Sequence, residues 1–217
     1  MENTTDPTVQ LFLNNLLRGD RVVCSEITRQ YLDEGHSIKE LYENVFKLAL
    51  YEVGRLWETN KITVATEHLA TAITEGILNE LFEQIVSGKR FNRKVVVACV
   101  EKEQHQVGIK KGADIFEMKG WERYFLGTGI PTSELIRYIH EVKPDLLAIS
   151  LSVYFNYANL VKMVETIRLE FPTLHILLGG QAFAHVSEAE SSSLGDVVIL
   201  PDLYLLEKYI DTLSTNS

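Results

Sequence analysis

The hydrophobic pattern of this chain changes its period once, near residue 90. Before that point apolar residues recur every three to four positions, as on one face of an α-helix, and no segment reads as a strand. After it, short β-branched runs alternate with helical segments. The pattern predicts an all-α N-terminal region over residues 9–88 and an α/β region over residues 95–217. The polar, basic residues 89–94 are expected to link them, and residues 1–8 to be disordered.

Four helical segments make up the expected N-terminal region. They cover residues 9–17, 21–32, 37–57 and 63–86. Ser37 followed by Glu40 is the pattern of a capping box at the start of the third segment, and Thr63 is a suitable N-cap for the fourth. Because short connections join these segments, they predict a compact four-helix bundle.

Five short apolar runs in the α/β region have the composition of strands. They cover residues 95–100, 123–126, 146–150, 176–178 and 197–200. Strands that alternate with helices predict a doubly wound parallel sheet. Five strands within about 120 residues fit a five-stranded flavodoxin-like, or Rossmann-like, arrangement, although the order of the strands cannot be read from the sequence.

Composition and charge exclude several classes of protein. The chain has 21 Lys and Arg against 30 Asp and Glu, a net charge of −9, so it lacks the overall electrostatic footprint of a nucleic-acid-binding protein. Its two cysteines, Cys24 and Cys99, can form neither a disulfide framework nor a Cys-based zinc site. There is no N-terminal signal region and no apolar run of the ~18 residues that span a bilayer. We therefore expect a cytoplasmic protein that contacts no membrane and no nucleic acid directly.

Turns that contain glycine or polar side chains follow the first four expected strands. Ligands of open parallel sheets bind beyond the carboxyl ends of the strands, so these turns form the candidate binding site. Glycines there allow a backbone or a ligand to approach closely, and serine hydroxyls donate and accept hydrogen bonds without bulk. The candidate residues are Glu103, His105, Gly108, Gly127, Ser150, Ser152, Gly179, Gly180 and Gln181.

Three of these turns, taken in order, resemble the motif of cobalamin-binding domains, which reads Asp-x-His-x-x-Gly, Ser-x-Leu, Gly-Gly. The matching segments are Glu103-x-His105-x-x-Gly108, Ser150-x-Ser152 and Gly179-Gly180. The resemblance implies that His105 ligates the cobalt of a cobalamin from below, and that the serine and glycine segments line a slot for its nucleotide tail. A neutral imidazole suits this role, and a carboxylate on its other nitrogen fixes the tautomer. Glu103 in place of Asp, and Ser152 in place of Leu, depart from the pattern.

The helical region resembles the cap of light-sensing cobalamin regulators, the group attached to MerR-type DNA-binding domains. Trp57 is followed, after nine residues, by the pair Glu67-His68. In that group the corresponding residues shelter the 5′-deoxyadenosyl group on the upper face of the cofactor. The resemblance therefore implies adenosylcobalamin, or another cobalamin such as methylcobalamin, as the cofactor. Some relatives also bind a bilin, and the sequence leaves a bilin open as a second chromophore.

Two features depart from the sensor pattern. The first expected helix begins within ten residues of Met1, so we expect no winged-helix domain in front of it. The output is then expected to pass through a homo-oligomer, a dimer or larger, or through a separate regulatory or effector protein. The residue after Trp57, a histidine in the best-known sensors, is Glu58 here. Either His68 or water would then have to bind cobalt after photolysis.

Three hypotheses remain open. The first is a sensor rather than an enzyme, in which light cleaves the cobalt–carbon bond of adenosylcobalamin and changes the conformation of the protein. The second is a corrinoid carrier that passes a methyl group between two methyltransferases and uses the same His105. Trp57 with Glu67-His68 favours the sensor, because a sensor has to hold a bulky adenosyl group. The third is an interaction domain without a cofactor, with His105 on the surface and Trp57 in a core. The three motif segments in order argue against it.

Overall fold

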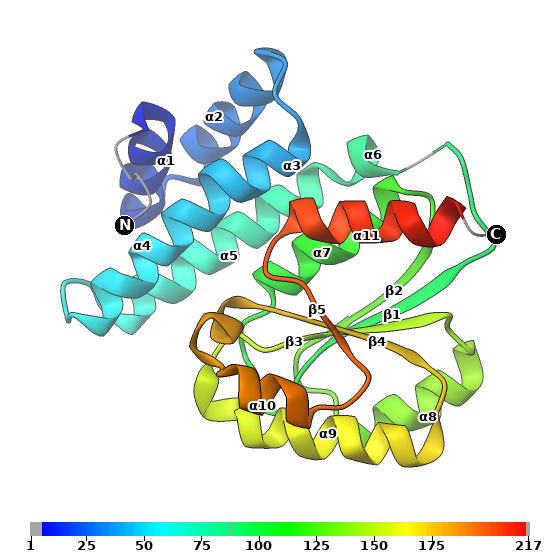
Figure 1. Ribbon diagram of the computed structural model, residues 1–217. Helices are drawn as coiled ribbons and strands as arrows, with labels where there is room; N and C mark the ends of the chain where they lie inside the picture. Colours follow the sequence, from blue (N-terminus) through cyan, green and yellow to red (C-terminus); the bar gives the residue numbers. More distant parts are fainter. Residues whose placement is uncertain (1–5, 87, 216–217) are drawn as a thin grey trace. The chain divides into compact units, whose positions relative to one another are not determined.

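The computed structural model describes residues 6–86 and 88–215. It divides into two compact units, a helical unit over Met1–Ile85 and a sheet unit over Val86–Ser217 (Figure 1). In the described part of the chain, no helix combines the length and the apolar character needed to cross a membrane. The expected disorder of residues 1–8 falls mainly on residues 1–5, which lie outside the described residues.

Helix α1 (Pro7–Arg18) begins two residues earlier than the sequence pattern indicates, inside the stretch expected to be disordered. The cause is local. The Asp6 carboxylate accepts a hydrogen bond from the amide of Thr8 at 2.7 Å, which caps the helix. Pro7 occupies the first turn, where a backbone N–H has no partner within the helix, so the lack of an N–H in proline costs no hydrogen bond.

The other helices of the helical unit follow through short turns. They are α2 (Arg21–Asp33), α3 (Ile38–Glu40), the π-helix η1 (Leu41–Phe46), α4 (Lys47–Glu58), α5 (Val64–Glu80) and α6 (Phe82–Ile85). The backbone stays helical from α3 to α4, so these segments form the single third helix that the sequence predicts. The capping box of Ser37 with Glu40 and the Thr63 cap are both present. The predicted fourth helix is interrupted after Glu80 and continues as α6.

Aromatic side chains form the centre of the helical unit. Phe12 of α1 stacks on Phe46 of η1 with ring centroids 5.0 Å apart, and the Tyr42 ring lies 5.9 Å from that of Phe46. All three are fully buried, as is Cys24. Burial, together with the charge of Asp20, raises the pKa of the Cys24 thiol to about 12, so Cys24 is an inert packing residue.

The sheet unit alternates strands and helices. In chain order it contains β1 (Lys94–Cys99), α7 (Val107–Met118), β2 (Glu122–Gly127), α8 (Thr132–Val142), β3 (Leu146–Ser150), η2 (Tyr154–Asn156), α9 (Tyr157–Glu170), β4 (His175–Gly179), η3 (Gln181–His185), α10 (Glu188–Ser193), β5 (Val198–Ile199) and α11 (Leu203–Thr215). The strands are parallel, in the order β2-β1-β3-β4-β5. The predicted five-stranded parallel sheet is confirmed, and its strand order is the flavodoxin-like one.

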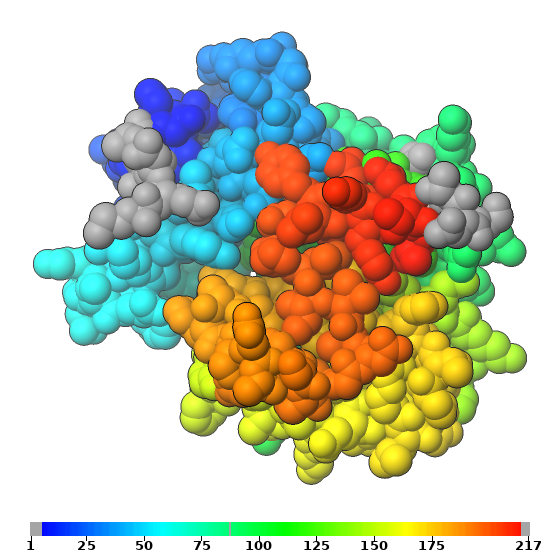
Figure 2. Space-filling model, in the orientation of Figure 1, coloured from blue at the N-terminus to red at the C-terminus, as the bar shows by residue number. Residues whose placement is uncertain are grey.

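Helices cover both faces of this sheet. In Figure 1, α7 and α11 lie on one face and α8, α9 and α10 on the other. The surface of the sheet unit that faces the viewer in Figure 2 is formed largely by α10, β5 and α11, coloured orange to red. The central strands β1 and β3 are buried on both faces, which explains their unbroken runs of Val, Leu, Ile and Ala.

The segment expected as a linker is bonded to the sheet unit. The amide of Phe91 donates to the carbonyl of Gly120 at 2.8 Å, and the Arg90 guanidinium pairs with Glu117 at 2.5 Å. Lys94, placed in the linker by the sequence analysis, is the first residue of β1. The basic residues of this segment therefore form bonds within the sheet unit and do not act as a solvated hinge.

Candidate cofactor site

A tight turn leads from the end of β1 to the motif residues. The amide of Glu103 donates to the carbonyl of Val100 at 2.9 Å, and Lys102, in the third position of this turn, has a φ of 72°. A lysine in the left-handed region is strained, because its Cβ crowds the backbone. Strain of this kind persists only where the surrounding structure holds it in place. The Glu103 side chain that follows is 1% exposed.

The carboxylate of Glu103 accepts hydrogen bonds from two turns. Its Oε1 accepts from the amides of Gln104 at 2.9 Å and His105 at 3.1 Å, and from Nδ1 of His105 at 2.7 Å. Its Oε2 accepts from the amides of Ser152 at 3.1 Å and Val153 at 3.0 Å. Glu103 therefore ties the turn after β1 to the turn after β3. Its carboxylate is buried, and hydrogen bonds from protein donors replace those that water would make.

These bonds decide the charge and the tautomer of the pair. Burial on its own raises the pKa of Glu103, but the hydrogen bonds from His105 and from the Val153 amide outweigh it and lower the pKa to about 2. An ionised carboxylate can only accept, so Nδ1 of His105 carries the ring proton. With the proton on Nδ1, Nε2 is the ring nitrogen whose lone pair can bind a metal. The His105 side chain is 46% exposed, within reach of an outside ligand.

Cys99, the last residue of β1, offers no competing metal ligand. Burial first, and the nearby charge of Glu103 second, raise the pKa of its thiol to about 12. The thiol, and not the thiolate, is present at neutral pH, and only the thiolate is a good metal ligand. The thiol donates instead to the carbonyl of His105 at 3.6 Å, so it helps to hold the histidine turn.

The other motif residues meet at the same edge of the sheet. Ser150 ends β3, is buried, and lies in register with Gly179 of β4. The Ser152 hydroxyl donates to the carbonyl of His105 at 3.4 Å. Gln181 is exposed and opens η3. Residues separated by more than 70 positions in the sequence therefore lie along one edge, as the strand-end rule predicts.

The glycines at this edge serve different purposes. Gly108 is exposed in the first turn of α7, and a Cβ placed on it would meet no atom within 4 Å, so there is room for a ligand. At Gly180, with φ of 115°, a Cβ would lie 2.2 Å from the Leu151 carbonyl oxygen. At Gly127, with φ of 69°, it would lie 2.4 Å from Oε1 of Gln106. The close approach expected at Gly180 is therefore made by the backbone of Leu151, which leaves no room for a side chain there.

The predicted residues of the helical unit flank one turn. Trp57 lies in the last turn of α4, and Glu67 and His68 lie in the first turns of α5. Nδ1 of His68 bonds Oε2 of Glu67 at 2.5 Å, and the Thr71 hydroxyl donates to Oε1 of Glu67 at 3.1 Å. The Trp57 residue is 43% exposed, so it is not a core residue of this unit. Trp57, Glu67 and His68 are called the helical-turn cluster below.

One contributor to the sheet-edge site was missed in the sequence. Nδ2 of Asn156 donates to Oε2 of Glu103 at 3.4 Å, and Asn156 is buried. It stands at the start of α9, where an asparagine is normally interpreted as a helix cap, yet its side chain does not cap that helix. The only signal in the sequence is an asparagine shortly after the third expected strand. Glu103, His105, Ser152, Val153 and Asn156 are called the sheet-edge cluster below.

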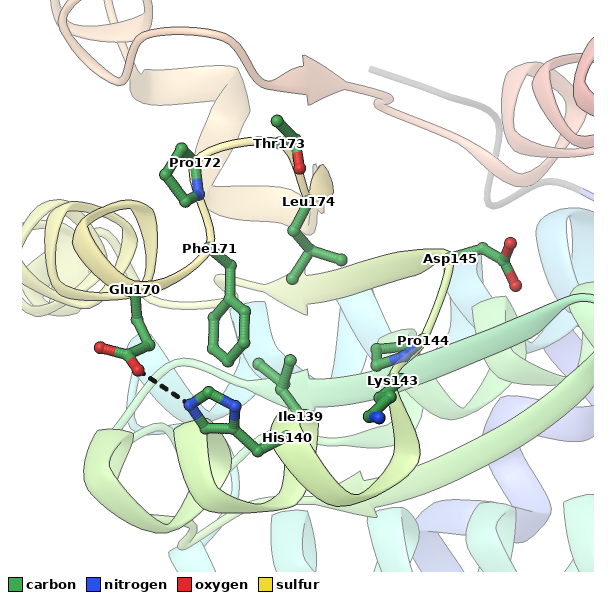
Figure 3. Close-up of a pocket in the computed structure, with 10 residues that line it drawn as sticks. All are labelled: Ile139, His140, Lys143, Pro144, Asp145, Glu170, Phe171, Pro172, Thr173 and Leu174. Atoms are coloured by element: carbon green, nitrogen blue, oxygen red, sulfur yellow. Dashed lines mark hydrogen bonds and ion pairs between the residues drawn. The ribbon is translucent and has the colours of Figure 1, made fainter.

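A pocket of about 460 Å³ lies at the opposite edge of the sheet unit (Figure 3). It is lined by the turn between α8 and β3 and the turn between α9 and β4. In it, Nε2 of His140 pairs with Glu170 at 2.9 Å, and the His140 ring packs on Phe171 at 4.6 Å. No motif residue lines this pocket, and open parallel sheets bind ligands at their other edge, so it is not assigned to the cofactor.

Family models match both units of the chain. One B12 binding domain model matches residues 9–82, and a second B12 binding domain model matches residues 93–203. The chain belongs to the B12-binding family. It is a cobalamin-binding protein, and its cofactor is a corrinoid. The sheet-edge cluster fits such a group by its own chemistry, because it presents an imidazole whose Nδ1 is held by an ionised carboxylate, and a side chain at Gly108 would meet open space.

Relatives of this B12-binding protein fall into two groups. The chain is 27% identical over 142 residues to the HTH-type transcriptional repressor CarH of Myxococcus xanthus, a match that covers 65% of this chain and 47% of the repressor. It is 23% identical over 154 residues to trimethylamine corrinoid protein 1 of Methanosarcina acetivorans, covering 69% of this chain and 70% of that protein. This chain therefore spans only about half the length of the repressor.

A solved structure confirms the fold. The Methanosarcina barkeri monomethylamine corrinoid protein superposes with a TM-score of 0.80, covering 93% of this chain and 96% of that chain. The sequence identity is 13%, so this likeness shows that the two proteins share the fold of a helical region followed by a Rossmann-like sheet.

Proposed function

We propose that this protein is a photoreceptor that binds adenosylcobalamin and signals through a change of conformation. The observation that carries the proposal is the helical-turn cluster, an exposed tryptophan and a Glu–His pair on the two sides of one turn. Similarity to the repressor CarH, and 29% identity over 128 residues to the repressor CarA of Myxococcus xanthus, support a regulatory role. Adenosylcobalamin supplies a cobalt–carbon bond that visible light cleaves.

In this proposal the residues of the chain divide the work. His105 binds the metal through Nε2, while Glu103 keeps the proton on Nδ1. Trp57 offers a flat apolar surface to the adenosyl group, and Glu67 accepts hydrogen bonds from ribose hydroxyls. Once the adenosyl group is gone, His68 or water would be left to hold the metal, because the position after Trp57 is Glu58 and carries no imidazole.

In this proposal the signal is transmitted by a change at a protein–protein interface. Loss of the adenosyl group removes contacts that favour one conformation of the protein, and the population shifts to the other. In the cytoplasm this shift changes a homo-oligomer or the binding of a separate regulatory or effector protein.

A methyl carrier is the second candidate. The match to trimethylamine corrinoid protein 1 covers 70% of that protein, whereas the match to the repressor covers 47% of the repressor. A carrier uses the same His105 and the same sheet edge. A carrier does not need a site selective for the adenosyl group, whereas the photoreceptor does. Selectivity for adenosylcobalamin therefore distinguishes the two candidate functions.

Light scattering before and after illumination tests the proposal. The protein is loaded with adenosylcobalamin in the dark, its mass and hydrodynamic radius are measured, and green light is applied until the absorption spectrum shows complete photolysis. A photoreceptor is expected to change mass or radius, and the same protein loaded with methylcobalamin in the dark serves as the control. Complete photolysis with unchanged mass and radius contradicts the proposal. Equal dark affinity for both cobalamins would then favour the carrier.

A further inference from the structure

Glu101 makes a second connection between the histidine turn and the rest of the sheet edge. It is the second residue of the Val100–Glu103 turn and belongs to no motif segment. Its Oε2 accepts two hydrogen bonds from Thr132, one from the backbone amide at 3.1 Å and one from the hydroxyl at 2.7 Å. The hydroxyl bond first, and the amide bond second, lower the pKa of Glu101, so the carboxylate is charged at neutral pH.

The partner of Glu101 is the exposed start of a helix. Thr132 is the first residue of α8, and the residue before it, Pro131, provides no side-chain cap. The first amides of a helix lack partners within the helix, and the helix dipole favours a negative charge there. Glu101 therefore caps α8 from another loop, across 31 positions of sequence.

The turn that carries the metal ligand is thus held from both neighbouring strands. β1 lies between β2 and β3 in the sheet. Glu101 ties the turn to the segment that follows β2, and Glu103 ties it to the segment that follows β3. Between these two carboxylates lies Lys102 in its strained left-handed conformation. Glu103 is two residues from His105 and bonds it directly, whereas Glu101 bonds Thr132, which belongs to no motif segment.

We infer that Glu101 is a positioning residue for His105: its bonds to Thr132 hold the turn in the one conformation that presents the imidazole to the metal. The inference rests on the proposed role of His105 as the cobalt ligand. Without Glu101 the turn relaxes at Lys102, Glu103 remains, and His105 ligates the metal in a smaller fraction of molecules.

Hydrogen exchange of the protein without cofactor tests the structural half. In Glu101→Ala the amides of Gln104 and His105 are expected to exchange about five- to ten-fold faster than in wild type, because two bonds to a charged group are lost. Glu101→Gln keeps one oxygen that can accept both bonds and is expected to stay within about two-fold of wild type. Glu134→Ala removes another carboxylate from the first turn of α8 and is the matched control.

Electron paramagnetic resonance tests the functional half. Protein labelled uniformly with ¹⁵N and saturated with cob(II)alamin shows a doublet when a protein nitrogen ligates the cobalt, and a triplet when the ¹⁴N of the cofactor tail does. Wild type and Glu134→Ala are expected to show the doublet in full, and Glu101→Ala to lose at least half of it at saturating cofactor. Thr132→Val is expected to lower the intensity of the doublet when introduced into wild type. Introduced into Glu101→Ala, it is expected to cause no further loss.

The outcomes separate the two claims. A full doublet in Glu101→Ala, or an equal loss in Glu134→Ala, overturns the positioning role while His105 remains the ligand. No doublet in wild type overturns the ligand role of His105 and the inference with it. Faster exchange in Glu101→Ala with a full doublet shows that the bonds to Thr132 are structural only and also overturns the inference.

Discussion

The sheet-edge cluster and the helical-turn cluster differ in how firmly the protein holds their side chains. Glu103 is 1% exposed and accepts bonds from two turns, and the histidine it binds has a fixed tautomer. In the helical-turn cluster the Trp57 residue is 43% exposed and the His68 side chain 75% exposed. The comparison indicates that the side chains of the sheet-edge cluster are organised in advance, whereas those of the helical-turn cluster are free to adjust.

Removal of the Glu103 carboxylate is expected to have the largest effect of the substitutions that test this difference between the two clusters. Glu103→Ala leaves the donors of two turns without this buried acceptor and is expected to lower the free energy of unfolding by about 3–5 kcal/mol. Glu67→Ala, in the helical-turn cluster, is expected to cost less than about 1 kcal/mol, because its histidine partner is largely exposed. Urea denaturation of both variants measures the difference. Equal costs would show that the two clusters are held alike.

Acid should weaken the protein through the same carboxylate. The pKa of Glu103 is about 2 in the folded protein against an ordinary value of 4.5, so the unfolded chain binds the proton first as the pH falls. Its contribution is complete above about pH 5 and is lost as the pH falls through 4.5 toward 2, for a total of roughly 3 kcal/mol. Urea denaturation as a function of pH should show a steeper acid loss in wild type than in Glu103→Gln. Parallel curves would contradict the assignment.

Trp57 should matter for ligand choice more than for stability. Trp57→Ala is expected to lower the dark preference for adenosylcobalamin over methylcobalamin by about ten-fold, the size typical of one aromatic contact residue. Tyr51→Ala is the matched control, because Tyr51 lies on the same helix and is 44% exposed. Titrations followed by absorption measure both ratios. If the two variants keep the wild-type ratio, Trp57 does not contact the adenosyl group.

Substitutions at Lys102, whose backbone is strained, are expected to have the smallest effect on stability. Lys102→Gly relieves a φ of 72° and is expected to raise stability by no more than about 1 kcal/mol, since the glycine also gains freedom in the unfolded chain. Lys102→Val is expected to lower stability by about 1 kcal/mol, because a β-branched residue fits the left-handed region poorly. Thermal denaturation compares the two. A stabilising valine would show that the turn is not strained there.

The sequence predicted those features whose cause lies close along the chain. The helices and the strands follow from periodicity, and the pairing of Glu103 with His105 was implied by the resemblance to the cobalamin-binding motif. The strand order could not be predicted, because it depends on how distant segments pack. Asn156 and Glu101 were missed for the same reason: their partners lie 53 and 31 positions away. Gly180 was expected to allow the close approach of a backbone or a ligand, but that the backbone is that of Leu151 could be learned only from the folded sheet.

The central claim is that His105 binds the cobalt, and one measurement tests it most directly. Uniformly ¹⁵N-labelled wild type, His105→Ala and His68→Ala are each saturated with cob(II)alamin, and their electron paramagnetic resonance spectra are compared. The account predicts a ¹⁵N doublet in wild type and in His68→Ala, and its complete loss in His105→Ala. A doublet that survives in His105→Ala, or one that disappears in His68→Ala, would contradict it.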